Sequence, residues 1–327
     1  MAKPGQRNAI TDVPGLKVGQ SQDKDIATGV TVILPDERAV CAADVRGGGP
    51  GTRETDALQP ETLVDAADAV VLSGGSSYGL AAADGVAAEL GAARRGFELF
   101  PNPDIPVSPV VPAAILYDLA NGGNKSWGDT PPYAALGRKA VTSVSLDVTE
   151  GKAGAGTGAM AGSLPGGIGT ASVVTEDGYT VGAIVAVNCF GSVRIPGTGA
   201  FWAAPYEIDG EFGGIPMPAK TKFDPEDWGE AKFNPAAGAN TTIAAVATDA
   251  MLSSADAKRV AQMASAGFAR AIRPVFTPLD GDTVFALSTG RKKLAEPVAF
   301  TLARIGSMAA DCLARAIARG VHAAGQR

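Results

Sequence analysis

Apolar residues in this chain come in short runs separated by turns rich in glycine and proline. The segment 28–52 predicts two strands joined by a Pro-Asp turn and closed by a glycine-rich loop. AVVLSGG at 69–75 predicts a short buried strand, and LAAADGVAAELGAA at 80–93 has the composition of a helix that ends near a glycine. The five prolines within 101–112 favour an extended loop or a sheet edge.

Further strands are predicted along the rest of the chain. AVTSVSLDV at 140–148 alternates between apolar and polar residues as a strand does, and TVGAIVAVNCFG at 180–191 is an apolar strand. Between these two segments, 151–174 is expected to form a glycine loop. TIAAVATDA at 242–250 predicts a central buried strand, and DTVFALST at 282–289 predicts another.

Two helices are predicted near the C-terminus. The segment 253–272 follows a strand, and Ser253 and Asp256 have the spacing of a capping box at its start. The segment 296–319 predicts a final helix that is stopped by Gly320.

The segment 203–240 differs from its surroundings. It contains seven acidic residues and five prolines without a sustained period, which indicates an exposed, irregular stretch that would tolerate being cut. No fixed repeat and no clear linker divides the chain, so one domain over 1–327 is expected. Strands outnumber those that a βαβ alternation would need, which favours a layered α+β sandwich.

Composition narrows the class of protein. The 327 residues are 46% hydrophobic and 19% charged, as in a globular protein with a substantial core. The net charge of −6 argues against a nucleic-acid partner. The N-terminus lacks the apolar stretch of a signal peptide, and no uncharged run is long enough to span a membrane. Three well-separated cysteines without disulfide or zinc spacing fit a reducing cytoplasm.

The chain has a single histidine, His322, five residues before the C-terminus. GSSYG at 75–79 matches the G-x-S-x-G pattern, with a predicted strand before it and a predicted helix after it. One hypothesis is therefore a serine hydrolase in which Ser77 uses Asp282 and His322. The alternative is a tight turn whose serines line a pocket. A triad depends on its base, and this base would lie in a segment prone to fray, so the turn is favoured.

Two further motifs have competing interpretations. GAGTG at 154–158 resembles a dinucleotide-binding loop, but Pro165 and further glycines follow where that fingerprint needs a helix, so turns without a cofactor are expected. In DGD, Asp280 and Asp282 would point to one face of a strand, where two carboxylates can hold an ammonium or a hydroxyl group. An Asp-Gly hairpin turn explains DGD equally well.

The stretch GANTTIAAVATDA at 238–250 leads to the most specific hypothesis about catalysis. A long irregular segment ends there, a buried strand begins, and the chain offers almost no histidine as a base. If the chain is cut before Thr241, the new α-amine titrates near about 7.7–8.0 and can take the proton of the threonine's own hydroxyl. The alternative is a threonine that merely opens a strand.

At these residues the sequence resembles the amino-terminal-nucleophile hydrolases. That family includes L-aminopeptidase/D-amidase-esterases, β-peptidyl aminopeptidases and 6-aminohexanoate (nylon) oligomer hydrolases. The resemblance covers almost the whole chain and rests on ITDVPGLKVGQ, GGSSYGL, PYAALGRKA, GAGTGA and AVNCFG. GANTTIAAVATDA and IRPVFTPLDGDTVFA are most similar to the nylon-oligomer hydrolase branch, because a serine usually follows the cut in the aminopeptidase branch.

The resemblance implies a role for several residues. Thr241 would be the nucleophile and Asn240 the residue whose carbonyl is cut. Asn188 would polarise the substrate carbonyl, and Asp280 and Asp282 would position the nucleophile. The other residues expected at the site are Tyr133, and for substrate binding Gly75, Ser76 and Tyr78.

The resemblance also implies an αββα four-layer sandwich of the aminopeptidase and ornithine-acetyltransferase type. The chain would cut itself into 1–240 and 241–327 and assemble as a homotetramer of αβ units. It would hydrolyse linear amides without a metal or other cofactor, with aminopeptidase or amidase-esterase activity as the alternative. Rival hypotheses are the Ser77 hydrolase and a non-catalytic binding protein on the same scaffold.

One departure from the family concerns a lysine expected after GAGTGA. This sequence has Ser163 and Pro165 in that neighbourhood, and Lys152 lies upstream. The source of any positive charge beside the nucleophile therefore stays open at this point.

Overall fold

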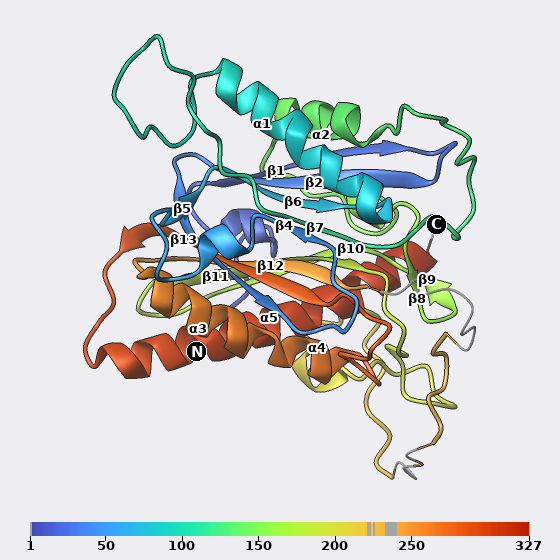
Figure 1. Ribbon diagram of the computed structural model, residues 1–327. Coiled ribbons are helices and arrows are strands. Elements are labelled where there is room, and N and C mark those ends of the chain that lie inside the picture. The colour runs from blue at the N-terminus through green and yellow to red at the C-terminus, as the bar shows by residue number, and fades with distance from the viewer. Residues whose placement is uncertain (1, 221–223, 225, 233–240, 327) are drawn as a thin grey trace.

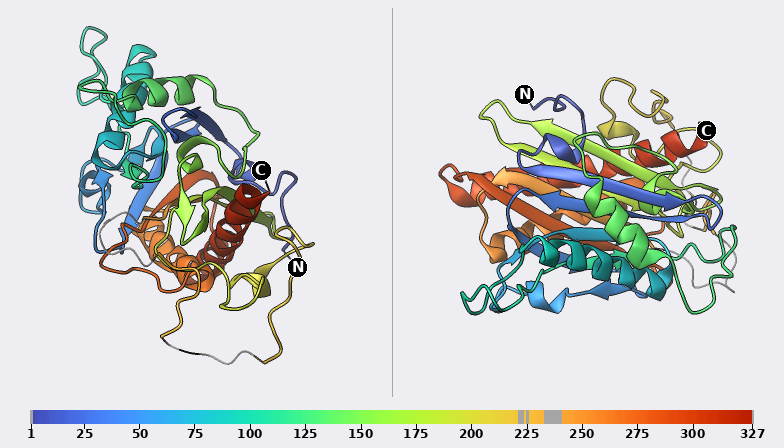
Figure 2. Two further views of the ribbon diagram at one scale, coloured as in Figure 1. Left: turned by 90° about the vertical axis from the view of Figure 1, so that its right-hand side faces the viewer. Right: turned by 90° about the horizontal axis from the view of Figure 1, so that it is seen from above.

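The computed structural model describes residues 2–220, 224, 226–232 and 241–326. Two β-sheets are stacked face to face, and helices cover the outer face of each (Figure 1). Figure 2 shows the same layers from two further sides. The order of layers is therefore helix, sheet, sheet, helix, as an αββα sandwich requires.

The smaller sheet has the strand order β1-β2-β6-β7-β4. Its members are β1 (Leu16–Asp23), β2 (Thr28–Pro35), β6 (Val70–Ser73), β7 (Ala113–Ile115) and β4 (Thr52–Arg53). Two helices, α1 (Ala82–Ala92) and α2 (Tyr133–Thr142), cover its outer face. A 3-10 helix, η3 (Ser76–Ala81), connects β6 to α1.

The larger sheet has the order β10-β11-β12-β13-β3-β5. Its members are β10 (Gly167–Val174), β11 (Thr180–Val187), β12 (Ile243–Ala250), β13 (Thr283–Lys292), β3 (Ala39–Val45) and β5 (Ala66–Ala67). Its outer face is covered by α3 (Ser254–Ala264), α4 (Ala266–Ala271) and α5 (Val298–Gly325). A short hairpin, β8 (Met160–Ala161) with β9 (Leu164–Pro165), precedes β10.

The strand β12 is the centre of the larger sheet, as its sequence predicts. It pairs antiparallel with β11 and parallel with β13, and every one of its residues is buried. Alternate residues face the two sides: Ala244 and Val246 contact the helix layer, whereas Ala245 and Ala247 contact the smaller sheet. A strand buried on both faces needs the continuous apolar run seen in the sequence.

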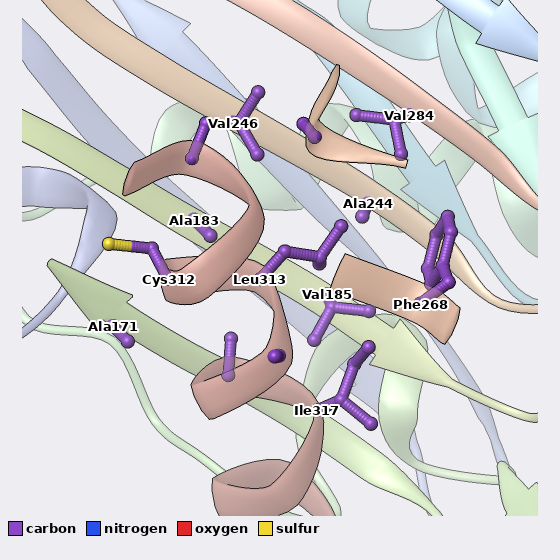
Figure 3. Packing of buried hydrophobic residues seen from close by; sticks show 14 of the residues in the cluster. Ala171, Ala183, Val185, Ala244, Val246, Phe268, Val284, Cys312, Leu313 and Ile317 are labelled. Atoms are coloured by element: carbon purple, nitrogen blue, oxygen red, sulfur yellow. The ribbon is translucent and has the colours of Figure 1, made fainter. Parts of the chain in front are cut away.

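The helix α5 packs along the larger sheet, with Leu313 and Ile317 over Val185 of β11 (Figure 3). The predicted end of this helix at Gly320 is wrong, because α5 continues to Gly325. Gly320 lies inside the helix where it meets β10: a Cβ there would come within 2.8 Å of the Gly169 nitrogen. The glycine permits close packing and does not terminate the helix.

Two other expectations about local structure are wrong. The segment 140–148 is not a strand, since α2 includes residues up to Thr142 and buries Leu136 and Ala140 against the smaller sheet. A helical spacing of buried residues overrides the short alternation. The segment 151–174 is not one glycine loop, because it includes the hairpin β8-β9 and the strand β10.

The predicted strands of 28–52 exist, but β2 and β3 belong to different sheets. In the described parts of 203–240, the only regular element is the 3-10 helix η5 (Ala204–Tyr206). A buried ion pair between Glu211 and Arg315 of α5, 2.6 Å apart, fastens this segment to the helix layer. Among the described residues, no helix is both long and apolar enough to cross a membrane.

Candidate active site

Thr241 lies two residues before β12, at the end of the sheet where β11 finishes. Its side chain is buried, with 3% of the residue exposed. Its backbone N–H donates a hydrogen bond to the carbonyl oxygen of Asn188, 3.0 Å away. Antiparallel pairing brings these two residues together, because the end of β11 faces the start of β12.

Asp280 and Asp282 approach the same place from the parallel neighbour β13. Both are 1% exposed, and both lie between the end of a turn over 277–280 and the start of β13, so the hairpin-turn interpretation of DGD is wrong. Asp282 accepts hydrogen bonds from the backbone N–H groups of Thr242 at 2.9 Å and Phe276 at 3.2 Å. The backbone just before β12 is thereby hydrogen-bonded directly to the side chain of Asp282.

The first carboxylate is anchored in the same manner. Asp280 accepts hydrogen bonds from the Phe190 N–H at 3.1 Å and from the Thr277 hydroxyl at 2.6 Å. Burial raises the pKa of both carboxyl groups, and repulsion from Asp280 raises the pKa of Asp282 further. The pair therefore holds a proton more firmly than exposed carboxyl groups do.

Gly281, between the two carboxylates, lies against the Thr241 side chain. A Cβ at Gly281 would come within 2.8 Å of Thr241 Oγ1 and within 2.7 Å of the Gly49 carbonyl oxygen. On the other side, the Gly49 N–H donates to the Asp280 carbonyl oxygen at 2.7 Å. The glycine loop that follows β3 thus supports the DGD backbone, and only glycine fits between that loop and the threonine.

The side chain of Asn188 is fixed by donors from two loops. Its Oδ1 accepts the Met160 N–H at 2.9 Å and the Asn121 amide at 3.1 Å. Its Nδ2 donates to the Tyr117 carbonyl oxygen at 3.0 Å. Because a backbone N–H can only donate, these contacts determine which end of the amide carries the nitrogen.

Two further residues of the site, Asn121 and Lys232, were not predicted from the sequence. Asn121 follows β7 and also donates to the Gly158 carbonyl oxygen at 2.9 Å, so it ties the GAGTG loop to Asn188. The signal for Asn121 in the sequence was the polar stretch that follows a buried strand. The side-chain nitrogen of Lys232 lies 3.4 Å from both the carbonyl oxygen and Oδ1 of Asn188. Nothing in its irregular surroundings marks it in the sequence.

The other predicted site residues lie at the start of α2 and in the connection between β6 and α1. Tyr133 begins α2, where its ring packs against Gly75 and forms an edge contact with Trp127. Burial raises the pKa of the Tyr133 phenol, so it stays protonated. Tyr78 is 49% exposed and forms an edge contact with the same tryptophan. Ser76, with a positive φ of 53°, donates its N–H to the Leu116 carbonyl oxygen.

The alternative triad does not form. Ser77 is exposed in η3, and Asp282 is buried between the Thr242 and Phe276 N–H groups. The His322 ring instead packs against Phe201 on the far helix layer. These three residues therefore do not act together. GAGTG forms a 3-10 turn, η4 (Gly154–Gly156), as expected, and Lys152 is exposed.

The arrangement around Thr241 places a buried hydroxyl beside two carboxyl groups and an oriented side-chain amide. Such a set suits acyl transfer, in which a hydroxyl attacks a carbonyl and an amide N–H stabilises the oxyanion. Asn240, the residue whose carbonyl would be cut, lies outside the described residues.

Comparison with known proteins identifies relatives over most of the chain. The profile of peptidase family S58 matches residues 8–326. A protein of Mycobacterium tuberculosis named an uncharacterized aminopeptidase is 45% identical over 336 residues, covering 96% of this chain and 93% of the relative. A 6-aminohexanoate-oligomer endohydrolase of a Kocuria species is 30% identical, covering 87% of this chain and 76% of the relative.

Solved structures share the fold. A β-aminopeptidase of a Burkholderia species aligns with a TM-score of 0.71 at 24% identity, covering 98% of this chain and 88% of that one. The L-aminopeptidase D-Ala-esterase/amidase of Ochrobactrum anthropi, described as a variant of the Ntn hydrolase fold, aligns with a TM-score of 0.72 at 22% identity. It covers 99% of this chain and 88% of its own. The αββα architecture that the family resemblance implied is confirmed.

Proposed function

Since this chain belongs to peptidase family S58, we propose that it is an amide hydrolase that activates itself by cutting before Thr241. The observation that carries the proposal is the burial of Thr241 between the carboxylate pair and Asn188. The cut would leave the pieces 1–240 and 241–327, and both would stay in one sandwich because β12 is its central strand.

In the uncut chain, the Thr241 hydroxyl attacks the carbonyl carbon of Asn240. The peptide bond is converted to an ester on Thr241 Oγ1, and the nitrogen of Thr241 becomes an amine. Water then hydrolyses the ester, which releases the carboxyl group of Asn240 and restores the hydroxyl. Asp282 stabilises the geometry of this step, because it binds the next N–H along the strand, that of Thr242.

In the cut protein, the Thr241 amine takes the proton of its own hydroxyl, which attacks the substrate amide. The amide nitrogen of Asn188 is the donor that we assign to the developing oxyanion. Met160 and Asn121 hold the oxygen end of that amide, so its nitrogen need not reorient during the reaction. The substrate amine leaves, and water releases the acyl group from Thr241.

The substrate class that we propose is a linear amide, with 6-aminohexanoate oligomers as the first candidate. The 30% identity to an endohydrolase of those oligomers and the Asn-Thr and Asp-Gly-Asp residues support that candidate. The alternative is aminopeptidase activity, which the 45% identity to proteins named aminopeptidases supports. Assembly as a homotetramer of αβ units remains a prediction from the family resemblance, and a cytoplasmic location remains a prediction from the cysteines.

Separate substitutions of the two adjacent buried threonines, Thr241 and Thr242, test the proposal. Thr241→Ala should remain a single chain after prolonged incubation and lose at least about a thousandfold of kcat/KM on a panel of 6-aminohexanoyl, β-alanyl and L-aminoacyl amides. Thr242→Val is the matched control, because it keeps the backbone and nearly the same volume. It should be cut and remain active. An active Thr241→Ala protein would exclude Thr241 as the nucleophile.

A further inference from the structure

Lys232 brings a positive charge into the Thr241 site from outside the sheet. Its backbone N–H donates to the Phe190 carbonyl oxygen at 2.8 Å, and its side-chain nitrogen lies 3.4 Å from the Asn188 carbonyl oxygen. That oxygen is also the acceptor for the Thr241 nitrogen, 3.0 Å away. The lysine side chain and the nitrogen that cleavage would free therefore share one acceptor.

The segment that carries Lys232 is fastened to the hairpin β8-β9. The Ser163 N–H donates to the Glu230 carbonyl oxygen at 2.8 Å, and a Cβ at Gly162 would come within 2.1 Å of that same oxygen. The glycine therefore lets the hairpin backbone approach residue 230 closely. The backbone that carries Lys232 thus lies directly against the hairpin β8-β9.

We propose that Lys232 is a positioning residue whose charge keeps the freed amine of Thr241 unprotonated, and hence able to act as the base. This inference rests on the proposed function. Two cations that share an acceptor repel each other, so a charged lysine makes protonation of the neighbouring amine less favourable. The same ammonium also holds Oδ1 of Asn188, 3.4 Å away, which leaves the nitrogen end of that amide for the substrate.

The groups around Lys232 decide which of the two nitrogens carries the charge. Burial lowers the pKa of Lys232 to about 8, while Cys189 and Asp280 act in the opposite direction. Burial raises the pKa of the Cys189 thiol, so the thiol is neutral at pH 7 and the carboxyl group of Asp280 is the neighbour that favours the charged form of the lysine. A lysine with a pKa of about 8 is mostly charged at pH 7, and that charge favours loss of the proton from the neighbouring Thr241 amine.

The positions of Lys152 and Pro165 explain why neither residue supplies the positive charge. Lys152 is exposed on the surface, and Pro165 of β9 has no charge. Lys232 reaches the site across the hairpin on which a lysine was expected from the family resemblance. The positive charge is therefore present in the site, although its place in the sequence differs from that expectation.

The test compares Lys232→Met with Lys152→Met, which removes an exposed lysine as a matched control. Mass spectrometry first establishes that each preparation is fully cut, and kcat/KM is then measured from pH 5 to pH 9 on the amide that the wild type cleaves best. Loss of the Lys232 charge should move the acid limb of the profile to higher pH by about one unit. The control should retain the wild-type profile. A fully cut Lys232→Met protein with an unmoved acid limb would overturn the inference.

Lys232→Arg keeps the test decisive if the methionine variant is not cut. Arginine retains the charge at every pH used, so this variant should be cut, with an acid limb at or below the wild-type position. An uncut Lys232→Arg protein that unfolds cooperatively, or an acid limb above that of the wild type, would overturn the inference. Failure of the proposed function looks different, because then the wild type itself would be uncut or inactive on the panel.

Discussion

Ser77 and Thr241 are two hydroxyl residues at the ends of buried strands, and each completes a nucleophile pattern in the sequence. Ser77 follows β6 in an exposed 3-10 turn, whereas Thr241 precedes β12 and is 3% exposed. Thr241 has a carboxylate pair and an oriented amide beside it. Ser77 has the better-known motif, and Thr241 has the environment that a nucleophile needs.

The difference lies in what distant parts of the chain supply. Asn188 comes from the end of β11, and Asp280 and Asp282 come from the segment before β13, which the sheet order places on the two sides of β12. A motif such as G-x-S-x-G describes only a local turn. Catalytic competence depends on neighbours that the topology selects.

Gly281→Ala should have the largest effect of the substitutions that leave Thr241 itself unchanged. The new methyl group would lie 2.8 Å from Thr241 Oγ1 and 2.7 Å from the Gly49 carbonyl oxygen, so either the threonine or the loop must shift. A displacement of the nucleophile by about 1 Å costs on the order of a hundredfold in rate. Both the rate of self-cleavage, followed by mass spectrometry, and kcat/KM should fall by at least about that factor.

Gly91→Ala is the control for the glycine substitution. Gly91 lies in α1, and the atom nearest to its added Cβ is Pro109 Cγ at an ordinary 3.6 Å. Self-cleavage and kcat/KM should match the wild type. If Gly281→Ala behaved like Gly91→Ala, the close contact between DGD and Thr241 would have no functional role.

Asn121→Ala should have an intermediate effect, because it weakens only the support of Asn188. The Gly158 carbonyl oxygen and Asn188 Oδ1 each lose a donor, and such a loss costs about 1–3 kcal/mol in buried surroundings. We expect kcat to fall about tenfold with little change in KM. Asn124→Ala alters an exposed asparagine of the same loop and should leave kcat unchanged. Equal kcat values for the two variants would exclude an orienting role for Asn121.

The carboxylate pair predicts a pH dependence of stability. Burial and repulsion from Asp280 raise the pKa of Asp282 in the folded protein well above the value of about 3.9 in the unfolded chain, so above about pH 3.9 the folded state binds more protons. Stability should therefore fall as the pH rises from there through the raised pKa. In the Thr241→Ala protein, Tm should be a few degrees lower at pH 8 than at pH 5.5.

Adding Asp282→Asn to the Thr241→Ala protein isolates this contribution. The asparagine does not titrate, so Tm should decline less between the two pH values. Asp118, Asp249 and Asp311 also have raised pKa values because they are buried, and their contribution is common to both proteins. Parallel declines would show that the carboxylate pair does not hold the extra proton.

Ser77→Ala should have the smallest effect. The side chain is exposed, and surface substitutions of this kind usually change stability by less than about 0.5 kcal/mol. We expect kcat/KM within about twofold of the wild type and complete self-cleavage. A large loss of activity in fully cut protein would reverse the comparison and make Ser77 part of the reacting centre.

Much of the architecture follows from local pattern. The apolar run at 242–250 predicts the central strand, and the Ser253–Asp256 capping box begins α3 with a hydrogen bond of 3.2 Å from the Asp256 N–H to the serine hydroxyl. These features depend on residues close together in sequence, which is why sequence analysis finds them.

The features that were missed depend on contacts over long separations. A glycine such as Gly320 commonly ends a helix, but here Gly320 lies inside α5 and packs closely against Gly169. Lys232 lies in a polar, irregular segment, where a lysine normally faces solvent, yet the hairpin β8-β9 directs it into the site. Local propensity cannot report a contact whose partner lies on another element.

N-terminal sequencing of a fully active preparation determines whether the chain is cut before Thr241. We expect two sequences in equal amounts, one from the original N-terminus and one that begins Thr-Thr-Ile at residue 241. If the active protein yields only the original terminus, then no free amine exists beside the Thr241 hydroxyl, and the proposed mechanism is contradicted.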